Sequence, residues 1–208
     1  MTQGVIVTGT DTGIGKTVFA AALAGALQAA YWKPIQCGLD GGGDSERVRA
    51  LSGLPPGRIL PEAYRLQMPA SPHRAAEAEG IEISVSKLRL PEIDGPLVVE
   101  GAGGLMVPVN RQTLTIDVFA SWRLPVILVA RTALGTINHS LLSIEALNGR
   151  NIPILGIAFV GDEIADTERT IVEMGNVRRL GRLPLLDALT PAKLAETFAA
   201  HFRVEDFR

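Results

Sequence analysis

A strand, a loop and a helix can be read in sequence in 4-GVIVTGTDTGIGKTVFAAALAGALQAA-30, and this order predicts the fold class. The first six residues of this stretch form a β-branched run that ends in glycine, which favours a buried strand. Residues 17–30 are rich in alanine and leucine, which favours a helix by propensity and by length. The glycine-rich segment 9–17 joins the two. Strand, loop and helix in this order make the first unit of an α/β fold.

The rest of the chain repeats this alternation of short apolar runs and helical patterns. Further strands are predicted at 30–35, 96–101, 125–130, 153–160 and 177–183. Helices are predicted at 44–52, 72–79, 115–122, 136–149, 163–174 and 191–201, and residues 52–61 are expected to be a surface connection. Strands that are apolar on both faces and alternate with helices indicate a doubly wound, mainly parallel sheet with helices on both faces. We expect one domain over residues 1–208, with its ligands beyond the carboxyl ends of the strands.

Composition narrows the class of protein. The 208 residues are 47% hydrophobic and 20% charged, with a net charge of -2. Lys and Arg are scattered along the chain, so no basic face argues for nucleic acid or an anionic membrane. Cys37 is the only cysteine, which excludes an internal disulfide. The start of the chain lacks a signal-peptide pattern, and no apolar stretch approaches the ~20 residues of a membrane span. We expect a cytoplasmic protein with a small soluble partner.

Residues 9–17, GTDTGIGKT, come close to the Walker pattern G-x-x-x-x-G-K-[ST]. Five residues rather than four separate Gly9 from Gly15, so the loop is wider than usual. Such a loop binds phosphate because its backbone N–H groups point inward at a helix start, where the helix dipole favours an anion. Lys16 would reach the β- and γ-phosphates, and the Thr17 hydroxyl would bind Mg²⁺. A glycine-rich turn without a ligand is the alternative.

Five segments together resemble one family. GTDTGIGKT (9–17), WKPIQCG (32–38), ASPH (70–73), VVEGAGGL (98–105) and GTINHS (135–140) occur in the order and approximate spacing of the dethiobiotin synthetases, from the start of the chain to about residue 186. The resemblance implies a P-loop enzyme that uses ATP to join CO2, or bicarbonate, to 7,8-diaminopelargonate and so closes the cyclic urea of dethiobiotin. It also implies Mg²⁺ and a homodimer.

The implied reaction passes through anions only. An amine adds CO2 to give a carbamate, ATP phosphorylates the carbamate, and the second amine displaces phosphate. Such a site needs cations and N–H dipoles more than covalent catalysis. The resemblance assigns Lys16, Lys33 and Thr12 to catalysis. Lys33 ends the second predicted strand and is held extended before Pro34; a solvated lysine at a strand end is its alternative.

The resemblance assigns Mg²⁺ to Thr17, Asp44 and Glu100. Glu100 ends a buried strand, where a carboxylate without a cation would be costly. Its alternative is a paired acid or a helix cap, and Asp44 has the alternative of an N-cap for the helix that follows it.

The remaining assignments by resemblance concern the nucleotide and the substrate. The nucleotide is assigned to Gly13, Ile14, Gly15, Lys16, Thr17, Val18, Glu100, Gly101, Ala102, Gly103, Gly161, Pro184, Leu185 and Leu186. The substrate is assigned to Thr12, Lys33, Cys37, Ser71, Pro72, Gly103, Thr136, Ile137 and Asn138. Residues 136–138 open a helix whose free N–H groups suit the carboxylate of the substrate. In the family this segment serves the active site of the neighbouring subunit.

Two residues depart from the family pattern. Cys37 stands where Ser or Thr is usual, and a thiol is a weak hydrogen-bond donor. Gly161 stands where an Asn often reads the adenine edge, so we expect weak selection among nucleotide bases. His139 is interpreted as a packing or capping residue, and His73 is left open between structure and function.

Two other classes share parts of this pattern. Partitioning and cell-division ATPases are switches with a similar fold, but they carry an additional lysine five residues before the loop lysine, where this chain has Asp11. Cobyrinate-type amide synthetases need a glutaminase domain with a nucleophilic cysteine, for which a chain of 208 residues with Cys37 alone has no room.

Overall fold

A computed structural model describes residues 4–207; residues 1–3 and 208 of the predicted domain lie outside this description. Its main sheet has seven strands in the order β4-β2-β6-β1-β7-β8-β9, and every pairing in it is parallel. The strands are β1 (Gly4–Gly9), β2 (Ala30–Trp32), β4 (Ile59–Leu60), β6 (Leu97–Gly104), β7 (Val126–Arg131), β8 (Ile154–Val160) and β9 (Arg179–Leu183). The predicted parallel α/β sheet is confirmed.

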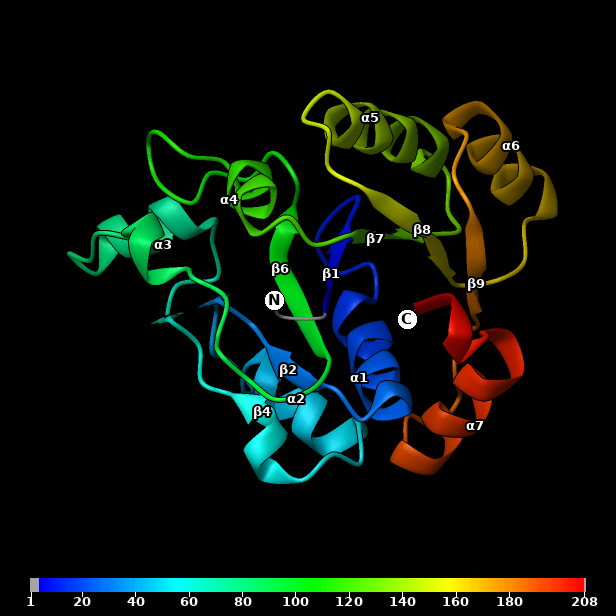
Figure 1. The fold of residues 1–208 in the computed structure, drawn as a ribbon, viewed down its shortest axis with the longest axis horizontal. Helices are drawn as coiled ribbons and strands as arrows, with labels where there is room; N and C mark the ends of the chain where they lie inside the picture. Colours follow the sequence, from blue (N-terminus) through cyan, green and yellow to red (C-terminus); the bar gives the residue numbers. More distant parts are fainter. Residues whose placement is uncertain (1–3, 208) are drawn as a thin grey trace.

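Helices cover both faces of this sheet (Figure 1). They are α1 (Lys16–Leu27), α2 (Asp44–Leu51), α3 (Pro72–Ala78), α4 (Thr115–Trp122), α5 (Thr136–Asn148), α6 (Ala165–Gly175) and α7 (Pro191–His201). Alternation along β1 shows how the faces divide: Val5 and Val7 pack under α1, α2 and α7, whereas Ile6 packs on the side of α4. Helices α5 and α6 cover β7 and β8 on that second side. The doubly wound arrangement follows from strands that are apolar on both faces.

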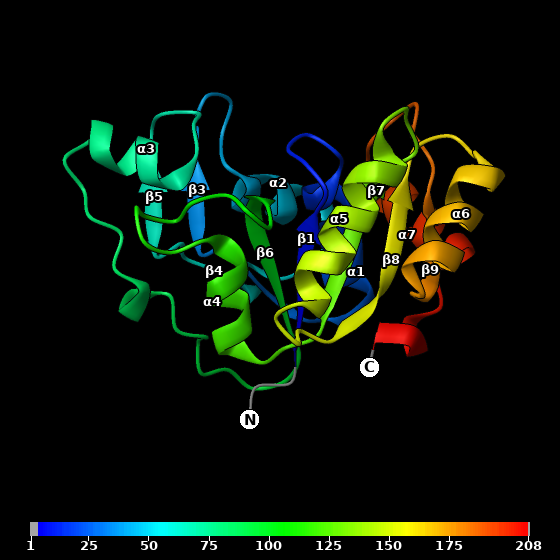
Figure 2. The ribbon, with the colours of Figure 1, turned by 90° about the horizontal axis from the view of Figure 1, so that it is seen from above.

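The predicted strand 30–35 is wrong in its extent. Strand β2 ends at Trp32, and β3 (Ile35–Cys37) pairs instead with β5 (Tyr64–Leu66) in a separate two-stranded parallel sheet. Pro34 interrupts the run because proline has no N–H to donate to a ladder. Figure 2 shows β3, β5 and α3 together at the end of the molecule away from β9.

The stretch 52–61 is more than a surface connection. It contains the short 3-10 helix Pro56–Arg58 and the edge strand β4, whose Ile59 is buried and pairs with Tyr31. Two further 3-10 turns, Val85–Lys87 and Val204–Phe207, lie elsewhere on the chain.

Four aromatic rings anchor α7 and the segment after it to α1. The ring centroid of Phe19 lies 5.5 Å from that of Phe202 and 6.0 Å from that of Phe198, and Phe198 stacks on Phe202 at 4.6 Å. Phe207 completes the cluster, and all four side chains are buried. This packing holds α1, the helix that follows the phosphate loop, through Phe19 in its first turn.

Replacing Phe202 with alanine tests this anchor. The substitution leaves a cavity among three aromatic rings, so we expect the free energy of unfolding to fall by about 3–5 kcal/mol. Urea denaturation followed by circular dichroism measures it. Met174→Ala is the control, because Met174 is 70% exposed on α6 and its loss should cost less than about 0.5 kcal/mol. Equal stability of the two variants would show that the cluster does not hold the helix.

Candidate active site

The loop between β1 and α1 has the backbone of a phosphate cradle. Helix α1 begins at Lys16, so the N–H groups of its first turn face the loop. Gly15 has φ 97°, and a Cβ there would lie 2.8 Å from Val160 Cγ1. Glycine is therefore required by conformation and by space. The wider loop still ends in the geometry that binds an anion.

This loop separates two pockets. The larger, about 650 Å³, extends toward β3, α2 and α3, and the smaller, about 440 Å³, extends toward β8 and the segment after β9. Gly13, Gly15 and Val18 line both pockets. Volumes of this size suit small molecules. A ligand that crossed the loop would therefore place one end in each pocket.

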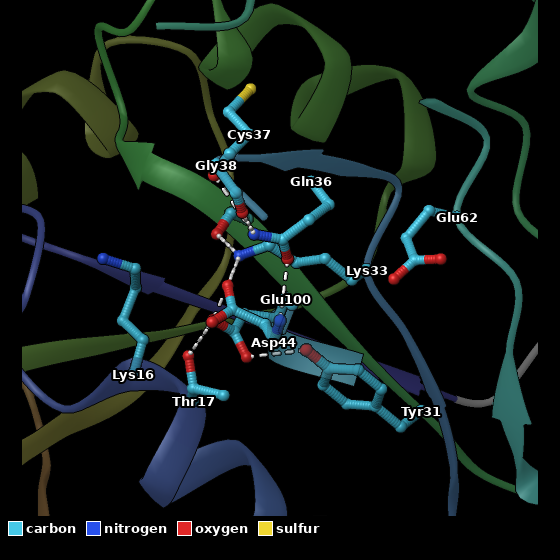
Figure 3. Close-up of polar contacts among 12 residues, drawn as sticks. Lys16, Thr17, Tyr31, Lys33, Gln36, Cys37, Gly38, Asp44, Glu62 and Glu100 are labelled. Atoms are coloured by element: carbon cyan, nitrogen blue, oxygen red, sulfur yellow. Dashed lines mark hydrogen bonds and ion pairs between the residues drawn. The ribbon is translucent and has the colours of Figure 1, made fainter. Parts of the chain in front are cut away.

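Three oxygen-bearing side chains meet in the larger pocket. Thr17 Oγ1 lies 2.8 Å from Glu100 Oε1 and 3.0 Å from Asp44 Oδ1 (Figure 3). A hydroxyl has one hydrogen, so it donates to one carboxylate at a time. The three predicted metal ligands are thus brought together from α1, α2 and β6. Asp44 is not the N-cap of α2, because Gly43 occupies that position.

Lys33 lies against the same two carboxylates and is 3% exposed, which rules out a solvated strand-end lysine. Its Nζ is 2.7 Å from Asp44 Oδ2 and 3.1 Å from Glu100 Oε1, and it donates to the Gly101 carbonyl at 3.0 Å. Burial lowers the pKa of Lys33, but Glu100 and Asp44 outweigh burial and raise it. All three ammonium hydrogens have protein partners. Lys33 therefore reaches a ligand only if one partner turns away.

Lys16 is turned toward its own loop instead. Its Nζ donates to the Asp11 carbonyl at 2.6 Å, and Figure 3 shows the amine pointing away from Glu100. Burial, with repulsion from Lys33, lowers the pKa of Lys16 to about 8. An anion in the cradle would replace the carbonyl as the partner of this ammonium and favour its charged form.

Three residues were missed by the sequence analysis: Gln36 and Arg47, which line the larger pocket, and Tyr31, which contacts Glu100 without lining it. The Gln36 side chain accepts from Asp44 N at 2.9 Å and donates to the Cys37 and Gly38 carbonyls, which ties β3 to the start of α2. Tyr31 donates to Glu100 Oε2 at 2.9 Å, and burial together with Glu100 raises its pKa well above the usual range. Arg47 lines the pocket from α2. Gln36 lies within the segment WKPIQCG, which was quoted without a role for it, whereas no motif contains Tyr31 or Arg47, and only the fold brings those two to the site.

The predicted contacts divide among the pockets. Thr12, Lys33, Cys37, Ser71, Pro72 and Gly103 line the larger one, whereas Ile14, Gly161, Pro184, Leu185 and Leu186 line the smaller. Ala102 lines the larger pocket, and Gly101 contributes its carbonyl to Lys33. Burial raises the pKa of the Cys37 thiol to about 11. Thr136, Ile137 and Asn138 line neither pocket of this chain.

Both histidines named from the sequence lie outside these two pockets. His139 is exposed on α5 and borders a third pocket of about 420 Å³, so packing within the chain does not account for it. His73 is half-buried on α3, and its backbone N–H donates to the Pro108 carbonyl at 3.3 Å. Within residues 4–207, no three His, Cys, Asp or Glu side chains gather in a metal-binding group, and no helix is long and apolar enough to cross a membrane.

Comparison with known proteins identifies the family of this chain. A family model described as an AAA domain matches residues 3–193. The chain is 64% identical over 207 residues to the ATP-dependent dethiobiotin synthetase BioD of Rhodopseudomonas palustris (strain BisB18), covering 100% of this chain and 99% of that protein. It is 59% identical over 207 residues to the enzyme of the same name from Brucella ovis, covering 100% of this chain and 98% of that one.

A solved structure shares the fold at low identity. The MinC:MinD cell division protein complex of Aquifex aeolicus matches with a TM-score of 0.54 and 14% identity, over 94% of this chain and 86% of that chain. This likeness concerns the fold alone. The near-complete match to the curated relatives goes further: the chain belongs to the family of ATP-dependent dethiobiotin synthetases.

Proposed function

We propose that this chain, acting as one P-loop domain, uses ATP to join CO2 to 7,8-diaminopelargonate and closes the cyclic urea of dethiobiotin. The observation that carries the proposal is the convergence of Thr17, Lys33, Asp44 and Glu100 in the pocket beside the phosphate loop. A switch ATPase needs a nucleotide site alone. Here a second pocket with its own polar lining lies beside that site, which suits a second substrate.

The chain positions and neutralises anions along the reaction. An amine nitrogen of the substrate bonds to the carbon of CO2 and releases a proton, which forms a carbamate. A carbamate oxygen then takes the γ-phosphoryl group, and ADP leaves. The second amine attacks the carbonyl carbon, loses a proton and expels phosphate. The loop N–H groups and Lys16 hold the transferring phosphoryl group, while Lys33 faces the carbamate from the larger pocket.

Mg²⁺ fits the donor set in this proposal. Thr17, Asp44 and Glu100 offer hard oxygens, and Mg²⁺ in nucleotide sites commonly takes one or two carboxylates together with phosphates and waters. With both lysines charged and both carboxylates ionised, the cluster is formally neutral. A triphosphate needs more positive charge, which one divalent cation supplies. Thr17 Oγ1 already approaches both carboxylates although it can donate to only one.

A second copy of the chain would complete the substrate pocket. Asn138 is exposed, and it lies at the start of α5 outside the larger pocket. The third pocket adjoins the phosphate loop through Asp11 and Thr12, and the exposed side chains of Met106 and Leu142 line it. Exposed apolar side chains beside a polar site are typical of subunit interfaces. In this dimer Thr136, Ile137 and Asn138 of each subunit serve the other subunit.

The smaller pocket would hold the nucleotide base, and it has few side chains that could distinguish one base from another by hydrogen bonds. Gly161 has φ 126°, and a Cβ there would lie 2.4 Å from Thr132 Oγ1, so Thr132 occupies the space of a larger side chain. Polar residues missed by the sequence analysis, Arg131 and Asp162, also line this pocket, but both are exposed. Solvated contacts discriminate weakly, because water replaces a missing partner.

Phosphate release tests the main proposal. With purified enzyme and MgATP, we expect release only when both diaminopelargonate and bicarbonate are present. Lys16→Ala should lower kcat/KM about 100-fold or more, since it removes a cation from the transferring phosphoryl group. Lys193→Ala is the control, because Lys193 is exposed and pairs only with Glu196 on α7. Release that ignores either co-substrate would contradict the ligase assignment.

Mixing two inactive variants tests the shared site. A heterodimer of Lys16→Ala and Asn138→Ala subunits has one site with both residues intact if Asn138 serves the partner. Random exchange in a two-fold dimer then restores about a quarter of wild-type activity. The measurement is activity after subunit exchange, with exchange followed by native mass spectrometry. Absence of recovery after confirmed exchange would place Asn138 in its own subunit's site or outside catalysis.

Steady-state rates with four triphosphates test base selection. We expect CTP, GTP and UTP to support dethiobiotin formation within about tenfold of ATP in kcat/KM, a difference of about 1.4 kcal/mol. The loop and Lys16 hold the triphosphate, which all four share, so Lys16→Ala should lower all four rates alike. A preference for ATP of about a thousandfold would show that a group at the smaller pocket reads adenine.

A further inference from the structure

Tyr31 contacts the oxygen of Glu100 that touches neither Thr17 nor Lys33. The phenol donates to Glu100 Oε2 at 2.9 Å, while Glu100 Oε1 contacts Thr17 Oγ1 at 2.8 Å and Lys33 Nζ at 3.1 Å. Figure 3 shows Glu100 between Thr17 and Tyr31. The two oxygens of one carboxylate therefore have separate partners.

Strand register explains how Tyr31 reaches this position. Tyr31 on β2 is paired with Val98 on the adjacent strand β6, and Glu100 is two residues farther along β6. Residues two apart on a strand point to the same face, so Tyr31 and Glu100 are diagonal neighbours on one side of the sheet. Both are 0% exposed. Bulk water therefore has no access to the hydrogen bond between the two side chains.

The phenol restricts how Glu100 can turn. A buried carboxylate oxygen without a donor is costly, so Oε2 stays where the Tyr31 hydroxyl is. The other oxygen is then fixed toward Thr17 and the phosphate loop. We propose that Tyr31 is a positioning residue that holds Glu100 by Oε2 and so presents Oε1 to the divalent cation of the metal–nucleotide complex. This inference rests on the proposed metal role of Glu100.

A purely structural role for Tyr31 makes a different prediction. Tyr31 also belongs to the core cluster that packs under α1, and loss of packing or of a buried hydrogen bond would lower stability without acting on metal binding in particular. Tyr64 provides the matched comparison, because it is the only other tyrosine and is also buried. Its hydroxyl accepts one hydrogen bond, from Ser84 N at 2.9 Å, in the separate small sheet.

The test compares Mn²⁺ binding by Tyr31→Phe and Tyr64→Phe. Electron paramagnetic resonance gives the Kd of Mn²⁺ for each protein in complex with a non-hydrolysable ATP analogue. Groups that orient a metal ligand are worth about 10- to 100-fold in metal affinity, so we expect the Kd of Tyr31→Phe to rise about tenfold or more. Tyr64→Phe should stay within about twofold of wild type. Affinity for the analogue in EDTA should be the same in all three proteins.

The measured affinities decide between the two explanations. A metal Kd for Tyr31→Phe within twofold of wild type overturns the inference, and so does an equal loss of metal-bound and metal-free nucleotide affinity. Glu100→Gln separates the inference from the metal assignment on which it depends. If Glu100→Gln weakens Mn²⁺ binding and Tyr31→Phe does not, only the role of Tyr31 fails. If Glu100→Gln also binds Mn²⁺ normally, the metal assignment of Glu100 fails.

An NMR measurement on the wild-type protein tests the same inference and does not depend on whether a Tyr31 variant folds. The chain has two tyrosines, so labelling with tyrosine carrying ¹³C at Cζ gives two NMR signals, and Tyr64→Phe assigns them. Adding Mg²⁺ to the complex with the ATP analogue should shift the Tyr31 signal and leave the Tyr64 signal in place, because only Tyr31 contacts a metal ligand. An unmoved Tyr31 signal contradicts the proposal.

Discussion

The buried charges at the carboxyl edge of the sheet are the constraint on which the site depends. The Nζ of Lys33 lies 2.7 Å from a carboxylate oxygen of Asp44 and 3.1 Å from one of Glu100. Water has almost no access to Lys33 and Glu100. Removing charges from water costs several kcal/mol for each ion, and pairing recovers only part of that cost. A sheet edge filled with apolar residues would be at least as stable. The cluster is therefore best explained by what it binds, and only together with the nearby Lys16 do its formal charges sum to zero.

The phosphate loop lies between two pockets that differ in their lining. Because Gly13 and Gly15 line both, a triphosphate bound as we propose would have its base on the side of β8 and its reacting end on the side of β3. The base side has a glycine at 161 and exposed polar residues, whereas the reacting side has the buried charges. In the proposed arrangement, binding energy would be concentrated on the phosphates and the second substrate, where the chemistry takes place.

Much of the fold could be predicted because periodicity and local motifs report it. The helix at 115–122 and the strand at 4–9 have the predicted bounds, and GKT places Lys16 and Thr17 at a helix start. The misses have physical reasons. Strand β4 has two residues, too few to show a period, and Pro34 divides a run that looks continuous. The contact of Tyr31 with Glu100 joins residues 69 apart, and no local pattern predicts such a pair.

The break at Pro34 also shows how the site is assembled. Because the chain leaves the main sheet after Trp32, Lys33 lies at the sheet edge beside Glu100, and β3 continues in a different direction. That direction brings the Gln36 side chain to the backbone N–H of Asp44, and this hydrogen bond fixes the start of α2. Asp44 Oδ2 then lies 2.7 Å from Lys33 Nζ. Tyr31, which precedes the break at Pro34, donates a hydrogen bond to Glu100. Residues 31–36 thus position both carboxylates, so the segment that ends one strand of the sheet also sets the geometry of the site.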